Sequence, residues 1–137
     1  MMIALDLEAS LIDNAISGLP RPGLRTFIEF CMDSFERVAL LTTVEESAAR
    51  EVLYSLADSG EIPEAFAAVE YINWQGEYKD LRYANDIAPE NILFVDDDEK
   101  WVHPEQTAQW IPIKPWHGDA DDAELTIIRQ VIRERIG

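Results

Sequence analysis

The hydrophobic positions of this chain alternate between short continuous runs and runs spaced three or four residues apart. Nearly continuous apolar runs, which are typical of strands buried on both faces of a sheet, occupy residues 2–5, 38–41 and 91–95. Helical spacing, with apolar residues on one side, occupies residues 24–34, 45–59 and from about 121 towards the C-terminus. Strands that alternate with helices in this way predict an α/β domain with a mainly parallel, doubly wound sheet.

The remaining segments carry weaker patterns. Residues 69–72 alternate and are rich in β-branched and aromatic side chains, which predicts a strand. Residues 110–113 predict a short strand, which Pro112 places at an edge of the sheet. Residues 79–87 predict a helix, and residues 64–66 a short turn. No repeat or linker interrupts the 137 residues, so we expect a single domain over residues 1–137.

Composition restricts the partners that this chain can bind. It has 27 acidic and 11 basic residues and a formal net charge of −16, which would repel nucleic acid and anionic membranes. Neither a basic protein segment nor a phosphate bridged by a metal ion is excluded. The single cysteine, Cys31, is expected to be a buried thiol in a reducing compartment. No apolar run approaches a membrane span, and we expect a cytoplasmic protein.

Three of the predicted strands end at polar side chains. Asp6 and Glu8 follow the first strand, Thr42 follows the second, and Asp96 and Asp97 follow the strand over residues 91–95. In an open α/β sheet these carboxyl ends lie at the edge where ligands bind. An extended segment places residues i and i+2 on the same side, so Asp6 and Glu8 could face one centre. Because clustered carboxylates repel one another, the pattern predicts a Mg2+ site at this edge.

The same residues are suited to phosphoryl transfer. An aspartate beside a metal ion can attack phosphorus and form an aspartyl-phosphate. Glu8 could protonate the leaving oxygen and then activate water. Lys79 could supply a positive charge for the phosphate, and Thr42 a hydroxyl donor. The four tryptophans are expected to pack in the core or at its rim, and neither His103 nor His117 is expected to be catalytic.

The order of these residues resembles the four motifs of the haloacid dehalogenase-like (HAD) superfamily. The motifs are Asp6-x-Glu8-x-Ser10, an apolar run ending at Thr42, then Lys79, and an apolar run ending at Asp96-Asp97. Within the superfamily, the chain is most similar to the NLI-interacting-factor or CTD-phosphatase-like group. The segments that carry this closer resemblance are residues 21–28, 76–81, 111–113, 116–119 and 122–125.

The resemblance implies a three-layer α/β/α, Rossmann-like fold and a Mg2+-dependent phosphatase that hydrolyses a phosphomonoester of a small molecule or a protein. It implies that Asp6 is the nucleophile, that Glu8 is the general acid/base, and that Thr42 and Lys79 hold the phosphoryl group. The implied metal ligands are Asp6, Glu8 (through its backbone carbonyl), Asp96 and Asp97. The segments after the first two strands are too short for a cap domain, so an open site is expected.

One position departs from the family pattern. Glu8 stands where the family has an aspartate, and its side chain is one methylene longer. A displacement of about 1 Å at a catalytic group can lower a rate by on the order of 100-fold. Two alternatives therefore stand beside the phosphatase hypothesis: a binding module of the same fold that has lost turnover, and a dehalogenase. Dehalogenation at carbon needs no Mg2+, so a requirement for Mg2+ would distinguish the phosphatase from the dehalogenase.

Overall fold

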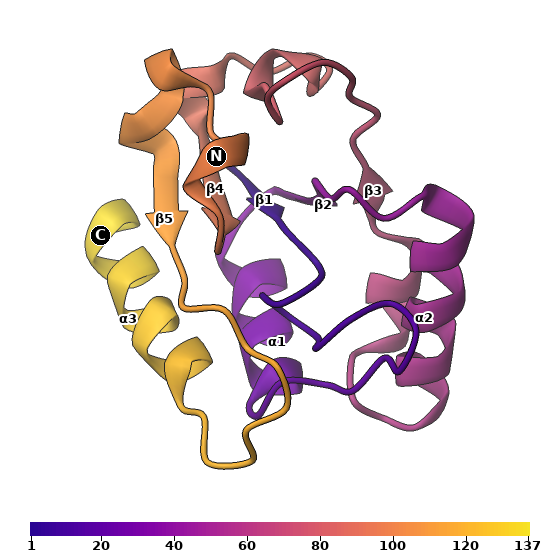
Figure 1. Cartoon of the computed structure of the whole chain (residues 1–137). Coiled ribbons are helices and arrows are strands. Elements are labelled where there is room, and N and C mark those ends of the chain that lie inside the picture. The colour runs from indigo at the N-terminus through magenta and orange to yellow at the C-terminus, as the bar shows by residue number, and fades with distance from the viewer.

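A computed structural model describes all 137 residues and places a five-stranded sheet at the centre of the protein (Figure 1). The strand order is β3-β2-β1-β4-β5, and every neighbouring pair is parallel. The strands are β1 (Met2–Leu5), β2 (Arg37–Leu40), β3 (Glu70–Tyr71), β4 (Ile92–Asp96) and β5 (Trp110–Pro112). The predicted α/β class with a mainly parallel sheet is confirmed.

Three α-helices cover one face of the sheet; in the view of Figure 1, α3 lies at the left, α1 below the centre of the sheet and α2 at the right. They are α1 (Leu24–Ser34), α2 (Glu46–Asp58) and α3 (Glu124–Ile136). Their apolar sides pack on inward-facing residues of the strands in a cluster of 26 buried residues. Glu124 in the first turn of α3, and Arg133 and Arg135 in its last turn, complement the helix dipole. The helix predicted over residues 24–34 coincides with α1, and the other two lie within three residues of their predicted positions.

Loops and four short 3-10 helices cover the opposite face and enclose a second cluster of ten buried residues. These helices are η2 (Leu81–Tyr83), η3 (Pro89–Asn91), η4 (Glu99–Trp101) and η5 (Pro104–Gln109). A fifth, η1 (Glu64–Ala68), lies on the α-helical face, where Phe66 joins the larger cluster. The chain moves from β1 to β3 in one direction and from β4 to β5 in the other. Right-handed crossovers therefore place the two sets of connections on opposite faces.

The helix predicted over residues 79–87 is wrong: only Leu81–Tyr83 forms a single 3-10 turn. The Asp80 carboxylate accepts the backbone N–H of Arg82, and the Gln106 side chain accepts that of Leu81 at 2.9 Å. These side-chain contacts satisfy the backbone groups locally, and Asp86, with a φ of 62°, leaves the right-handed helical region. A nine-residue segment is too short to be helical without tertiary support.

The two segments in which a cap domain would be inserted contain little additional structure. Residues 6–23 form a loop with two isolated bridges, Glu8 to Ile12 and Ile12 to Pro20. Residues 41–78 contain α2, η1, β3 and their connections. Both segments pack on the sheet and its helices, so the carboxyl edge of the sheet is left without a cap.

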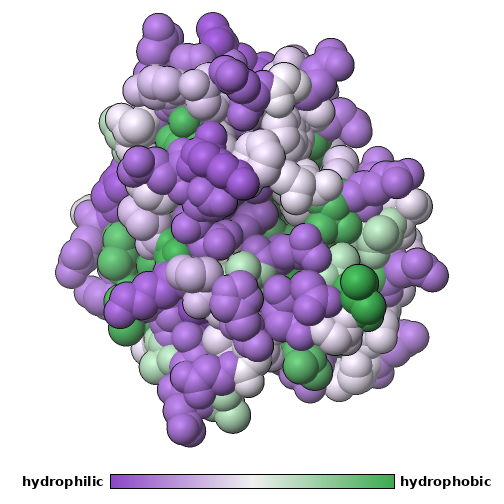
Figure 2. Space-filling model, viewed as in Figure 1, coloured by the Kyte–Doolittle hydropathy of each residue, from purple (hydrophilic) through white to green (hydrophobic).

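The surface is strongly hydrophilic. Figure 2 shows that polar side chains cover most of the face in view, with isolated hydrophobic patches, one of them where the loop after β1 meets α2. None of the helices combines the length and the apolar character that a membrane span requires.

Candidate active site at the carboxyl edge of the sheet

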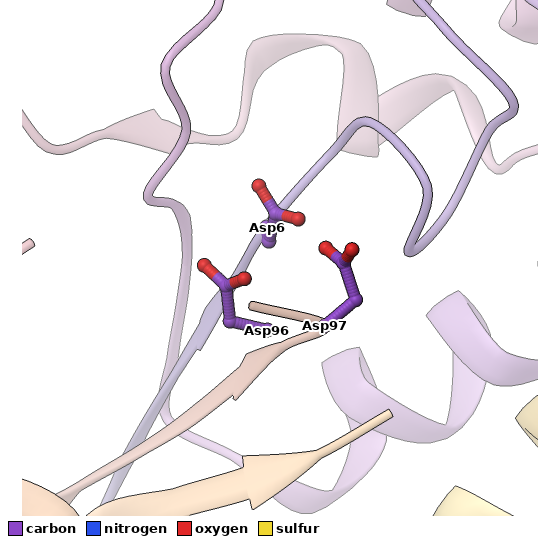
Figure 3. A group of neighbouring side chains, drawn as sticks. All are labelled: Asp6, Asp96 and Asp97. Carbon is purple, nitrogen blue, oxygen red and sulfur yellow. The ribbon is translucent and has the colours of Figure 1, made fainter. Parts of the chain in front are cut away.

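Three carboxylates meet at the carboxyl ends of the two central strands. Asp6 follows β1, Asp96 is the last residue of β4, and Asp97 comes directly after it. Because β1 and β4 are paired in register, with Leu5 opposite Val95, the residues after them emerge side by side. One oxygen from each of the three carboxylates lies within 4.8 Å of the other two (Figure 3). The structure thus brings together three of the residues that the sequence placed at this edge.

Lys79 joins two of these carboxylates. Its Nζ lies 2.9 Å from Asp6 Oδ1 and 2.6 Å from Asp96 Oδ2, and its side chain is 1% exposed. Its backbone N–H donates to the carbonyl of Trp101 at 2.8 Å, which fixes the segment just before η2 against η4. A lysine that comes from a loop, rather than from a strand end, therefore reaches the same buried centre as Asp6 and Asp96.

Burial sets the electrostatics of this centre. Burial raises the pKa of Asp6 to about 8; Lys79 opposes this shift and Asp96 adds to it. The pKa of Asp96 is likewise raised by burial and held back by Lys79. Burial lowers the pKa of Lys79, but the two carboxylates outweigh it, so that its pKa is raised overall. Lys79 is therefore an ammonium ion, and one positive charge does not compensate three carboxylates.

Ser10 is a further buried group of the site, and its hydroxyl contacts two of the carboxylates. Its Oγ lies 2.8 Å from Asp6 Oδ2 and 3.3 Å from Asp97 Oδ1. The loop after β1 curls back on itself through backbone hydrogen bonds from Ser10 and Leu11 to the carbonyl of Leu7, which brings the hydroxyl over Asp6. In the sequence, Ser10 stands out only as part of the Asp6-x-Glu8-x-Ser10 motif, which predicts no role for it. Its spacing of four residues from Asp6 was the available signal.

Thr42 lies at the end of the neighbouring strand. β2 pairs with β1, and the N–H of Leu41 donates to the carbonyl of Leu5, so Thr42 emerges beside Asp6 and is fully buried. Its Oγ accepts the N–H of Val44 at 3.1 Å. The hydroxyl proton takes part in none of the protein's hydrogen bonds, so Thr42 can donate it to a ligand.

Glu8 has a different environment from the other predicted site residues. Its Oε2 accepts the backbone N–H of Ala15 at 2.6 Å, and this contact ties the two arms of the loop after β1 together. Glu8 does not belong to the group of carboxylates that lie within ligand distance of one another. The structure therefore brings Asp6, Asp96 and Asp97 together and directs the Glu8 carboxylate towards the loop.

A comparison with protein families decides what this arrangement belongs to. The family model described as NLI interacting factor-like phosphatase matches residues 3–136. The chain belongs to this family. The family is part of the HAD-like group, so the resemblance noted in the sequence is confirmed, and membership supports a phosphatase activity. A comparison with curated proteins finds no match.

In this member of the NLI interacting factor-like phosphatase family, Arg21 holds the loop that carries the site. Its side chain is fully buried and donates from Nη1 to the carbonyls of Ala9 and Ser10, at 3.3 and 3.1 Å. Its Nε and Nη2 donate to the two carboxylate oxygens of Asp122, at 2.7 and 3.0 Å. The sequence indicates Arg21 only as part of a segment that resembles the family, because its partner Asp122 lies 101 residues away along the chain.

The donor set of the site suits a divalent cation. Asp6, Asp96 and Asp97 offer carboxylate oxygens, the hard donors that Mg2+ takes in proteins. The N–H of Asp98 donates to Asp96 Oδ1 at 2.9 Å, and such a hydrogen bond orients a ligating carboxylate. Because Lys79 alone leaves negative charge uncompensated here, a cation would allow all three carboxylates to ionise together.

Proposed function

We propose that this protein is a Mg2+-dependent phosphatase that hydrolyses a phosphomonoester through an aspartyl-phosphate at Asp6. The observation that carries the proposal is the position of Asp6, which lies against the ammonium group of Lys79 and within ligand distance of Asp96 and Asp97. The membership in a phosphatase family supports the same reaction class. Lys79 opposes the rise in the pKa of Asp6, and the neighbouring carboxylates can hold a cation that would favour the ionised form of Asp6 further.

The proposed reaction has two steps. In the first, a carboxylate oxygen of Asp6 attacks phosphorus, the bond from phosphorus to the leaving oxygen breaks, and the leaving oxygen takes up a proton. In the second, water attacks the phosphorus of the aspartyl-phosphate, loses a proton, and releases inorganic phosphate and the Asp6 carboxylate. Lys79 and Thr42 donate hydrogen bonds to the phosphoryl oxygens in both steps.

The metal ligands in this proposal are Asp6, Asp96, Asp97 and the backbone carbonyl of Glu8. Mg2+ bound there would attract the anionic phosphate to an acidic surface and stabilise the charge that develops on its oxygens. The net charge of −16 favours substrates other than polyanions, so we propose a phosphorylated small molecule or a protein segment with basic residues beside the phosphate.

Glu8 is the proposed general acid/base, and its hydrogen bond to Ala15 bears directly on that role. A general acid must come within hydrogen-bond reach of the leaving oxygen, and catalytic contacts often form only once substrate is bound. Glu8 therefore has to exchange the N–H of Ala15 for the leaving oxygen. The same contact favours a second function, a binding module for phosphorylated ligands in which Glu8 is retained as a structural group.

The test is the hydrolysis of a generic aryl phosphate with and without Mg2+. We expect phosphate release that requires Mg2+, is abolished in Asp6→Asn, and persists in the matched variant Asp33→Asn, which changes an exposed acid of α1. Release that is insensitive to a chelator would contradict the proposal. Mg2+ binding by calorimetry without any phosphate release, also after Glu8→Asp, would instead identify the binding module.

A further inference from the structure

A hollow of about 270 Å³ opens beside Thr42. The residues that line it are Thr42, Thr43, Tyr71, Asn73 and Trp74. A cavity of about 150 Å³ is enough to hold a benzene ring. The hollow therefore has room for a six-membered ring, and two of its five lining residues are themselves aromatic.

The order of the strands fixes where this hollow lies relative to the candidate site. Its lining residues come from the ends of β2 and β3, whereas Asp6 follows β1 and the other two carboxylates follow β4. Along the carboxyl edge of the sheet, the hollow therefore lies on one side of Asp6, and Asp96 and Asp97 lie on the other. When the phosphate group of a substrate is at Asp6, the group that is esterified to the phosphate can bind in the hollow.

The aromatic side chains of the hollow are attached to the segment that contains Thr42. The indole Nε1 of Trp74 donates to the carbonyl of Thr42 at 2.8 Å. The hydroxyl of Tyr71 donates to the carbonyl of Val44 at 2.5 Å. Each ring is thus held by its polar end and is half-buried, which leaves part of its apolar surface open.

A second tryptophan connects this wall to Lys79. Trp101 packs edge-to-face against Trp74, with ring centroids 5.7 Å apart and planes at 68°. The carbonyl of Trp101 accepts the backbone N–H of Lys79, and its ring centroid lies 5.9 Å from Lys79 Nζ. The tryptophan pair therefore bridges the two residues that, in the proposed function, bind the phosphoryl group.

We infer that the hollow beside Thr42 binds an aromatic leaving group, so that the substrate is an aryl phosphomonoester. This inference rests on the proposed phosphatase function and names the substrate class of the same site. An aryl ring is planar, uncharged and large enough to contact the wall, whereas a short alkyl group would leave the hollow to water. Trp74 is the specificity-determining residue, because it lines the hollow and is fixed to both Thr42 and Trp101.

The experiment compares Trp74→Phe with Trp74→Leu, using phenyl phosphate and ethyl phosphate as substrates. Both variants lack the indole N–H that binds the Thr42 carbonyl, but only the first keeps an aromatic ring. We expect kcat/KM for phenyl phosphate to be about tenfold lower in Trp74→Leu than in Trp74→Phe, the rate equivalent of one aromatic contact. For ethyl phosphate, the two variants should agree. Comparing variants on one substrate cancels the different reactivities of the two esters.

A binding measurement separates this inference from the proposed function. Phenylphosphonate and ethylphosphonate, which lack a hydrolysable bond, are titrated into both variants with Mg2+ present. Tighter binding of phenylphosphonate in Trp74→Phe, with the preference lost in Trp74→Leu, would support the aromatic hollow even if no phosphate were released from any ester. Equal affinities in the two variants, or equal losses of hydrolysis on both substrates, would overturn it.

Two sources of an aryl phosphate share this chemistry, a small aryl ester and a phosphotyrosyl side chain. A phosphotyrosyl peptide with flanking lysines and the same peptide with flanking aspartates distinguish them. A preference of the wild type for the lysine peptide over phenyl phosphate would support the aromatic hollow with a protein substrate. Faster hydrolysis of phenyl phosphate than of both peptides would support the aromatic hollow with a small-molecule substrate.

Discussion

The ion pair between Arg21 and Asp122 offers the sharpest test of how the site loop is held. The Arg21 side chain is fully buried and that of Asp122 is 16% exposed. The two form a bidentate contact, with N–O distances of 2.7 and 3.0 Å. Asp122→Asn keeps the shape but removes the charge and replaces one acceptor by a donor. Breaking a fully buried pair costs about 3–5 kcal/mol. Since water partly reaches Asp122, we expect the free energy of unfolding to fall by about 2–3 kcal/mol.

Urea unfolding followed by tryptophan fluorescence measures this loss. The matched control is Asp121→Asn, which changes the exposed neighbouring carboxylate and should alter the free energy of unfolding by less than about 0.5 kcal/mol. A decrease in Asp122→Asn that is no larger than that of the control would refute the reasoning. It would mean that the Arg21 guanidinium is satisfied by the carbonyls of Ala9 and Ser10 and by water alone.

The pH dependence of this difference has a definite sign. The hydrogen bonds from Arg21 lower the pKa of Asp122, and its unfolded value is about 3.9. A group whose folded pKa is lowered contributes stability that is present above the unfolded pKa and is lost as pH falls through the folded pKa. The difference between wild type and Asp122→Asn should therefore be constant from about pH 5 to pH 8 and shrink below about pH 4. A difference that grows on acidification would contradict the ion pair.

Two further predictions concern the site itself. Glu8→Asp shortens the side chain by one methylene and releases the N–H of Ala15. We therefore expect the rate of phosphate release from an aryl ester to rise several-fold. A decrease would show that the reaction requires the length of the Glu8 side chain. Burial raises the pKa of Asp6 to about 8, and only the ionised carboxylate ligates Mg2+. The Mg2+ affinity measured by calorimetry should therefore increase between about pH 6.5 and pH 8.5, and a flat profile would argue that Asp6 is not a ligand.

The sheet could be predicted from the sequence because its central strands are buried on both faces. β1 and β4 are fully buried along their length, and so they are continuous apolar runs in the sequence. The helices were found because each turns only one side to the core. The helix expected over residues 79–87 failed because its outcome depends on the Gln106 side chain, 25 residues away from Leu81. Local spacing contains no information on that contact.

The candidate site was predictable to the extent that it follows strand ends. Asp6, Asp96 and Asp97 converge because β1 and β4 are neighbours in the sheet, which the pattern of a doubly wound fold implies. Lys79 lies on a loop, so the strand ends that locate the carboxylates do not locate it; its chemistry made it a candidate, and the family resemblance gave its place in the site. The direction of the Glu8 carboxylate depends on the course of the loop after β1, which apolar periodicity does not determine.

The two buried basic residues show how the site is supported in so acidic a chain. Of 11 basic residues, Arg21 and Lys79 are the two that are buried, and both lie at the carboxyl edge of the sheet. Arg21 neutralises Asp122 and fixes the loop backbone, while Lys79 is shared between Asp6 and Asp96. Arg21 is matched by one carboxylate and forms a closed structural unit. Lys79 faces an excess of carboxylates, an imbalance that a bound cation would relieve, whereas the ion pair that holds the loop is already balanced.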